Sequence, residues 1–169
     1  DGSTDGSLNI INEYSDERIK ILVNPKNEGL IFSLNKGIEL ALGTYIVRMD
    51  ADDISLPQRI EEQVSFMEKH KEIGVCCTDI EVFGKSLNGY IHRFKRSPIA
   101  NNAALLFTTC FAHPSVIIRK SVLDQYHLCY NGVYRNAEDY GFWVELSKYT
   151  QFDNINKVFL KYRILKGSV

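Results

Sequence analysis

The first half of the chain alternates helix-like and strand-like segments, and this alternation constrains the fold more than any other feature. Leu34, Ile38 and Leu42 recur every four residues, which predicts a helix that Gly43 ends. Residues 45–49 then form a strand-like run, and a further helix is expected after it. This order is typical of an α/β fold, in which crossover helices cover a mainly parallel central sheet.

The other expected elements rest on shorter patterns. Helices are predicted from a cap at Ser3 or Thr4 through Leu8, Ile11 and Tyr14, from Pro57 through Ile60, Val64 and Met67, over 99–107, and over 138–149. Strands are predicted over 19–23, over 75–85 and 89–94 as a hairpin, over 115–119, and over 158–162. No internal repeat or linker is visible, which indicates one domain.

Charge and composition exclude several classes of protein. The net charge of −1 leaves no electrostatic footprint for nucleic acid. No apolar run approaches the roughly 18 to 20 residues that span a bilayer, and no signal peptide is visible. The four cysteines contain no C-x-x-C pair, which favours reduced, mostly buried thiols over a zinc site or disulfides. We therefore expect a cytoplasmic protein, and the composition is also compatible with peripheral attachment at the inner face of a membrane.

A dense acidic cluster follows the strand-like run at 45–49. Asp50, Asp52 and Asp53 place three carboxylates within four residues, at the strand end where such sheets bind ligands. Like charges this close need a cation or hydrogen-bond donors, and oxygen ligands suit Mg²⁺ or Mn²⁺ bound together with phosphates. Taken alone, the cluster is equally compatible with a solvated acidic turn that caps the next helix.

A second acidic turn opens the sequence as Asp1-Gly2-Ser3-Thr4-Asp5-Gly6. The carboxylate of Asp1 could accept a hydrogen bond from a nucleoside base or a sugar hydroxyl, whereas the simpler explanation of the turn is a helix cap. The turn also has part of a calcium-loop pattern. Its twelfth residue is Asn12 instead of the bidentate Glu, so calcium binding is not favoured.

The order of the motifs is more specific than any one of them. In sequence they are Asp1-Gly2-Ser3-Thr4-Asp5, Asn27-Glu28-Gly29, Ser33-Leu34-Asn35-Lys36-Gly37, Arg48-Met49-Asp50-Ala51-Asp52-Asp53, Pro57 with Arg59, His113-Pro114-Ser115, and Ala137-Glu138-Asp139-Tyr140-Gly141-Phe142-Trp143. This series resembles the family 2 glycosyltransferases, in particular the bacterial enzymes that build polysaccharide and lipopolysaccharide. The resemblance covers nearly the whole chain and implies their GT-A fold, an αβα sandwich.

For the donor, the resemblance implies a nucleoside diphosphate sugar and favours UDP as the nucleotide. Asp1 would contact the uracil or the ribose. Asp50 and Asp52 match the family's D-x-D positions, so Asp52 would be the stronger ligand of Mn²⁺ or Mg²⁺ and Asp50 would lie nearer the ribose and diphosphate. Arg163 would approach the diphosphate through charge-assisted hydrogen bonds, although a surface arginine at a strand end explains this residue equally well.

For the acceptor, the resemblance implies a saccharide or lipid-linked hydroxyl and a single displacement that inverts the anomeric configuration. Asp139 matches the family's catalytic base, whereas the sequence alone favours a first-turn acid stabilised by the helix dipole. Glu138 and His113 would lie on the acceptor side, although a lone histidine such as His113 is more often structural. Trp143 would either line an acceptor pocket or belong to the core.

The resemblance also implies one domain over 1–169, with a nucleotide-sugar-binding half over 1–74 and an acceptor-binding, catalytic half over 75–169. Two departures from the family pattern stand out. The family's first strand and nucleoside-holding loop would precede Asp1, so we expect the natural protein to extend upstream, and the absence of that strand threatens both folding and donor binding. The family's Tyr-Arg-x-His pattern is replaced by Tyr162-Arg163-Ile164-Leu165, which removes any role of that histidine.

Three alternatives stand beside a glycosyltransferase. A nucleotidyltransferase shares the layered plan and the acidic metal site, but its Gly-rich, basic phosphate loop is not seen. A haloacid-dehalogenase-like phosphatase also carries Asp-x-Asp after a strand, but a small-residue turn should follow where Asp53-Ile54 stands. A non-catalytic sugar-nucleotide-binding or scaffolding module fits a donor half that lacks its first strand.

Overall fold

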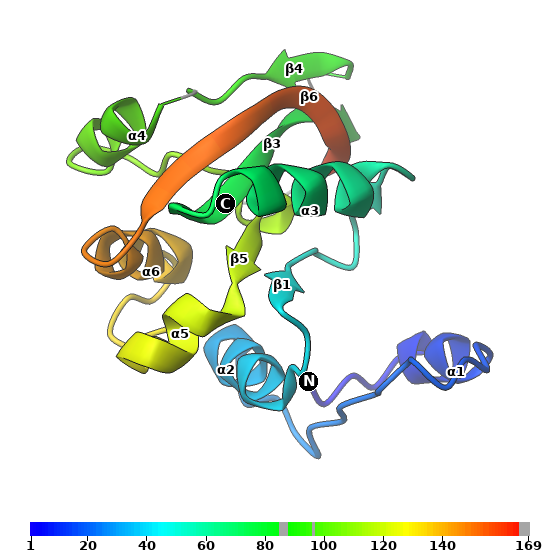
Figure 1. Cartoon of the computed structure of the whole chain (residues 1–169). Coiled ribbons are helices and arrows are strands. Elements are labelled where there is room, and N and C mark those ends of the chain that lie inside the picture. Colours follow the sequence, from blue (N-terminus) through cyan, green and yellow to red (C-terminus); the bar gives the residue numbers. More distant parts are fainter. Residues whose placement is uncertain (85–87, 96, 166–169) are drawn as a thin grey trace.

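A six-stranded mixed sheet with helices on both faces forms the centre of the molecule, in a computed structural model that describes residues 1–84, 88–95 and 97–165 (Figure 1). The strands are β1 (Tyr45–Val47), β2 (Ile54–Ser55), β3 (Ile73–Gly84), β4 (Tyr90–His92), β5 (Ile117–Arg119) and β6 (Gln151–Ile164). Their order is β1-β5-β3-β6-β2, and β4 pairs with β3 beside this path. The α/β class and the layered architecture predicted from the sequence are confirmed.

Helices cover both faces of this sheet. They are α1 (Ser7–Asn12), α2 (Leu30–Leu40), α3 (Arg59–Lys69), α4 (Pro98–Ala104), α5 (Lys120–Tyr126) and α6 (Glu138–Leu146), with the 3₁₀ turn η1 at His113–Ser115. Figure 1 shows α3 against the sheet, α2, α5 and α6 gathered beside β5, and α1 projecting away from the sheet. Within the described ranges, none of these helices combines the length and the apolar character needed to cross a bilayer.

Alternation along the strands divides the core between the two faces of the sheet. Val75 and Cys77 of β3 belong to the larger core cluster, which α2, α5 and α6 cover. Cys76 lies between them in sequence and packs with Met67 of α3 on the opposite face. Successive side chains of a strand point to opposite faces, so one central strand serves both clusters. Because both faces are covered, β3 is buried along most of its length.

The sheet is mixed instead of mainly parallel, which corrects the expectation from the sequence. Among the described strand pairings, β3 with β6 is parallel, whereas β1·β5, β3·β5, β3·β4 and β2·β6 are antiparallel. Hydrophobic periodicity identifies strands but carries no information on their direction. The β3–β4 hairpin, predicted correctly, is antiparallel because its connection is too short for a crossover. Part of the predicted turn, residues 85–87, lies outside the described residues.

The predictions for the N-terminal segment are partly wrong. α1 begins at Ser7 after Gly6 and has no side-chain cap, so neither Ser3 nor Thr4 caps it. The three apolar residues expected to face the core are exposed, and residues 19–23 form no strand because no described segment pairs with them. A hydrophobic period predicts an apolar face, but another segment must cover that face before it becomes core.

The buried face of α3 agrees with the prediction in part, since Met67 is buried and Val64 packs against the core. Ile60 is exposed, whereas Arg59 and Gln63 are buried. The Nη2 of Arg59 donates to the carbonyl of Arg48 at 2.8 Å, and the Nε2 of Gln63 donates to the carbonyl of Ser115 at 2.8 Å. Buried polar side chains need such partners. The helix therefore anchors two backbone segments, one after β1 and one at η1.

The ends of the later elements also shift. The helices predicted over 99–107 and 138–149 end earlier, at Ala104 and Leu146, and the last strand extends to 151–164 around the predicted 158–162. Neither α5 nor β2 was predicted, since elements of seven and two residues hold too few apolar positions to define a period. The expected burial of the thiols is confirmed for Cys76, Cys77 and Cys110, whereas Cys129 is exposed.

Candidate active site

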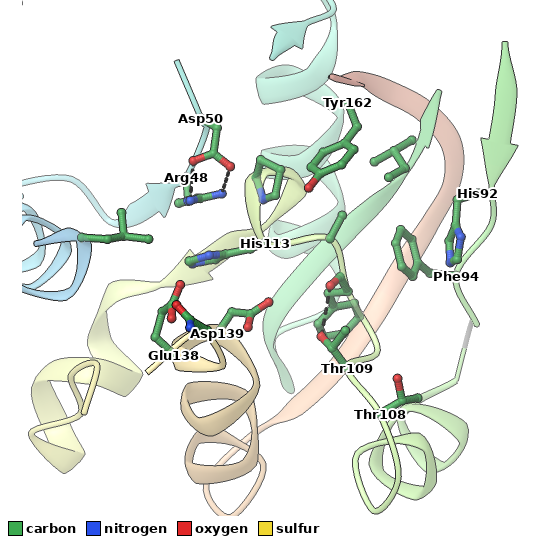
Figure 2. A pocket seen from close by; sticks show the side chains of 16 residues that line it. Arg48, Asp50, His92, Phe94, Thr108, Thr109, His113, Glu138, Asp139 and Tyr162 are labelled. Atoms are coloured by element: carbon green, nitrogen blue, oxygen red, sulfur yellow. Dashed lines mark hydrogen bonds and ion pairs between the residues drawn. The ribbon is translucent and has the colours of Figure 1, made fainter. Parts of the chain in front are cut away.

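A cavity of about 640 Å³ opens between the end of β1, η1 and the start of α6 (Figure 2). Its lining residues are Leu30, Arg48, Asp50, Ile80, His92, Phe94, Thr108, Thr109, Phe111, Ala112, His113, Pro114, Asn136, Glu138, Asp139 and Tyr162. They come from both halves of the chain. The fold therefore brings four predicted site residues together around one cavity, namely Asp50, His113, Glu138 and Asp139.

Asp50 is held by an arginine two residues earlier. Side chains two apart in an extended segment emerge on the same side, so Arg48 reaches Asp50 directly. The Nη1 of Arg48 donates to Oδ2 of Asp50 at 2.6 Å, and its Nη2 lies 2.5 Å from Oδ1. The side chain of Arg48 is 9% exposed, whereas that of Asp50 is 37% exposed. No motif of the sequence predicts a role for Arg48, although its two-residue spacing from Asp50 was the available signal.

Asp139 occupies the first turn of α6 and faces the cavity beside Glu138 (Figure 2). Its Oδ1 accepts a hydrogen bond from the backbone N–H of Tyr140 at 2.7 Å. Burial raises the pKa of Asp139 above its usual value, the Tyr140 N–H lowers it, Glu138 raises it, and Arg48 lowers it, with a net increase. A carboxylate with a raised pKa is a stronger base, so this environment suits proton abstraction.

His113 forms another wall of the cavity as a neutral side chain. Its Nε2 lies 2.7 Å from the hydroxyl of Tyr130, whose ring stacks on Phe142 with the centroids 4.1 Å apart. Burial, with a smaller contribution from Arg48, lowers the pKa of His113 to about 3. The imidazole is therefore neutral at pH 7 and can form hydrogen bonds without carrying charge. Tyr130 was not predicted as a site residue, because no motif surrounds it.

The rest of the acidic loop turns towards β6. Asp53 is buried, its Oδ1 accepts the backbone N–H of Arg163 at 2.9 Å, and its Oδ2 has no hydrogen-bond partner among the described residues. The Nε of Arg163 donates to the carbonyl of Asp52 at 2.7 Å, and its guanidinium packs over the ring of Phe83 at 4.4 Å. Asp52 is exposed, and neither Asp52 nor Arg163 lines the cavity. Arg163 therefore fixes the loop in this structure.

Asp1 lies apart from the cavity that Asp50 and Asp139 share. Its carboxylate accepts hydrogen bonds from the backbone N–H groups of Glu28 at 2.8 Å and Gly29 at 3.0 Å, and from the side-chain amide of Asn24 at 2.9 Å. Gly29 is the N-cap of α2, so Asp1 provides an acceptor at the start of that helix. Asp1 lines a separate cavity of about 300 Å³.

Trp143 does not line the acceptor side, which corrects that assignment in favour of the core. Its side chain is 0% exposed, and its ring meets those of Phe111 and His113 edge to face, with centroids 6.2 Å and 5.7 Å apart. The physical reason is the position of Trp143 one turn after Asp139. By that point α6 packs against the core, and only its first turn, with Glu138 and Asp139, reaches the cavity.

The acidic loop offers oxygen ligands for a cation without forming a complete cage. Within residues 1–84, 88–95 and 97–165, no three His, Cys, Asp or Glu side chains converge closely enough to hold an ion by themselves. Mg²⁺ is commonly bound through one or two carboxylates, with water and substrate phosphates as the other ligands. Asp50 at the cavity and the exposed Asp52 fit this mode, so the residues present suit a divalent ion that arrives with a diphosphate.

The family model and the relatives that match this chain are all described as glycosyltransferases. Residues 1–127 match the family model described as Glycosyl transferase family 2. An uncharacterised glycosyltransferase of Haemophilus influenzae is 37% identical over 97% of this chain and 54% of its own length. The Escherichia coli protein WfaP, named UDP-Glc:alpha-D-GlcNAc-diphosphoundecaprenol beta-1,3-glucosyltransferase, is 31% identical over 100% of this chain and 65% of its own length. The chain thus spans about half of the Haemophilus relative and under two thirds of WfaP.

Two solved structures share the fold. TarS of Staphylococcus aureus, in complex with UDP-GlcNAc, superposes with a TM-score of 0.81 at 18% identity and covers 98% of this chain and 48% of its own. The mannosyltransferase PcManGT of Pyrobaculum calidifontis, in complex with GDP-Man and Mn²⁺, has a TM-score of 0.69 at 14% identity and covers 98% of this chain and 46% of its own. At these identities the likeness establishes the architecture alone.

Proposed function

Because this chain belongs to glycosyltransferase family 2 and has the GT-A fold, we propose that it transfers a sugar from a nucleoside diphosphate to a hydroxyl of a saccharide or lipid-linked acceptor. The observation that carries the proposal is the convergence of Asp50 and Asp139 on one cavity. The name of WfaP, which gives a UDP-sugar donor and a diphospholipid-linked acceptor, supports UDP as the carrier and polysaccharide assembly as the context. Such an acceptor would be met at the cytoplasmic face of the membrane. Family membership sets aside the nucleotidyltransferase and phosphatase alternatives.

On the donor side, the residues of the acidic loop bind the diphosphate through a divalent ion. Asp50 and Asp52 would hold a divalent ion, Mn²⁺ or Mg²⁺, that arrives with the diphosphate. When bound, the ion supplies the positive charge that stabilises the departing diphosphate. Arg163 fixes the loop that carries Asp52, as its hydrogen bond to the Asp52 carbonyl indicates. Asp1 contacts the uracil or the ribose of the donor, and residues 1–74 form the nucleotide-sugar-binding half.

On the acceptor side, Asp139 acts as the general base. The acceptor hydroxyl gives its proton to the Asp139 carboxylate while its oxygen forms a bond to the anomeric carbon. The bond from that carbon to the diphosphate oxygen breaks on the opposite face, so one displacement inverts the configuration. Because proton transfer is concerted with attack, a carboxylate can act as the base near neutral pH. Glu138 and the neutral His113 bind acceptor hydroxyls, and residues 75–169 thus form the acceptor half.

Calorimetric titration of UDP into the chain is expected to show binding that requires Mn²⁺. Asp52→Ala should weaken this binding by about tenfold or more, since a contact to a charged group contributes about 1.5 to 3 kcal/mol. Asp124→Ala is the matched control, because Asp124 is an exposed aspartate of α5 that pairs with Lys120. Unchanged affinity in Asp52→Ala would remove Asp52 from the metal site, and no UDP binding by the folded chain would contradict the proposed donor.

A further inference from the structure

Arg48 is a largely buried cation that lines the candidate active site. Its side chain is 9% exposed, and both oxygens of Asp50 are within 2.6 Å of its guanidinium nitrogens. Its charge also acts on the pKa values of His113, Tyr130 and Asp139, so the guanidinium lies within Coulombic reach of several walls of the cavity. A buried cation is strongly destabilising without an anion, and Asp50 is the anion that the structure gives to Arg48.

A metal ion competes with Arg48 for the same carboxylate. Arg48 engages Oδ1 and Oδ2 of Asp50, so an ion that binds Asp50 must share an oxygen that already accepts a hydrogen bond from the guanidinium. The ion would then stand beside a guanidinium of like charge, and Arg48 would lose part of its counter-ion. Binding of the metal alone is therefore opposed by an interaction that the protein itself provides.

We propose that Arg48 is an internal counter-ion for Asp50 that transfers to the donor's diphosphate, so that the metal and the nucleoside diphosphate bind cooperatively. This inference rests on the function proposed above. A diphosphate carries enough negative charge for both cations, and a guanidinium binds phosphate oxygens in the same two-point geometry as a carboxylate. Each ligand thus removes the electrostatic obstacle to the other, and the coupling is reciprocal.

The simpler explanation is that the Arg48–Asp50 pair only holds the loop in shape. The backbone of Arg48 is fixed independently of its side chain, because its N–H donates to the carbonyl of Val116 at 3.2 Å and its carbonyl accepts from Nη2 of Arg59 at 2.8 Å. Replacing the side chain therefore leaves the strand end anchored. The two explanations predict opposite signs for metal binding, since loss of a structural pair weakens every ligand whereas loss of a competitor strengthens the metal.

The test is to measure two affinities in Arg48→Gln, that of Mn²⁺ alone and that of UDP at saturating Mn²⁺. We expect the affinity for Mn²⁺ alone to rise about threefold or more and the affinity for UDP to fall about tenfold or more, with the cooperativity seen in the wild type reduced. Arg18→Gln is the matched control. Arg18 makes the same kind of two-point pair with Asp16, also two residues away, but 85% of its side chain is exposed, and both affinities should stay unchanged.

Weaker binding of both Mn²⁺ and UDP in a folded Arg48→Gln would overturn the proposal. If that variant does not fold, Arg48→Lys decides, because an ammonium holds a carboxylate at one point and should release Asp50 to Mn²⁺ more readily than the wild type does. A wild type that binds no UDP at any Mn²⁺ concentration would refute the proposed function instead. The comparison with Mn²⁺ alone would still test the counter-ion role in that case.

Discussion

Asp139→Asn is expected to lower kcat for sugar transfer by about 10²- to 10⁴-fold, the range that a positioned general base contributes. The amide matches the carboxylate in shape but cannot accept the proton of the acceptor hydroxyl. Asp139 lines the same cavity as Asp50 but from a different element, α6, so the affinity for UDP with Mn²⁺ should be unchanged. Release of UDP from a UDP-sugar, with and without acceptor, is the assay.

A matched control separates chemistry from helix stability. Glu61 is a first-turn acid of α3, is exposed, and does not line the cavity, so Glu61→Gln removes a comparable helix-dipole interaction without touching the site. It should keep full turnover. In the wild type, protonation of Asp139 should lower the rate as the pH falls. The midpoint of this loss should lie above pH 3.8, the usual pKa of an aspartate, because burial raises the pKa of Asp139. Near-normal turnover in Asp139→Asn would show that another group takes the proton.

Trp143→Ala is expected to lower the free energy of unfolding by about 3 to 5 kcal/mol, the usual effect of removing a large buried aromatic side chain. The side chain is fully buried against Phe111 and His113. Trp143→Phe should lose much less, because it keeps an aromatic ring, and the indole Nε1 has no hydrogen-bond partner among the described residues. Urea denaturation measures both changes.

An exposed aromatic residue just beyond the same helix provides the comparison. Tyr149 is 42% exposed and stacks on Tyr126, so Tyr149→Ala should lower the free energy of unfolding far less than Trp143→Ala. If Trp143→Ala left the stability intact and instead raised the KM for the acceptor, Trp143 would be a sugar-stacking residue after all. The assignment to the core would then be wrong.

The parts of the site that follow from local rules were predictable from the sequence. Asp50 was expected at a strand end, and it lies directly beyond β1 at the cavity. Asp139 was expected in the first turn of a helix, and α6 begins at Glu138. In both cases the side chain lies within a few residues of the element that positions it, so hydrophobic periodicity and turn chemistry were sufficient.

The parts that depend on long-range contacts were not predictable in this way. The hydroxyl of Tyr130 meets His113 from a segment with no recognisable motif. Arg59 lies beside the predicted apolar face of α3 and is buried there, because its guanidinium donates to the carbonyl of Arg48. The prediction of a mainly parallel sheet was wrong for the same reason, since strand directions are set by tertiary connections and not by the two-residue period. Trp143 shows that membership of a motif does not place a side chain in the site, because this residue of the Asp139 motif belongs to the core.

The anomeric configuration of the sugar that the chain first releases from an α-linked donor tests the proposed single displacement. UDP-glucose and UDP-N-acetylglucosamine would be incubated with the chain and Mn²⁺, and proton NMR would follow the product before mutarotation mixes the anomers. We expect the β anomer to appear first and Asp139→Asn to slow its release by about 10²- to 10⁴-fold. Initial release of the α anomer, or release that Asp139→Asn leaves unchanged, would contradict a single displacement assisted by Asp139.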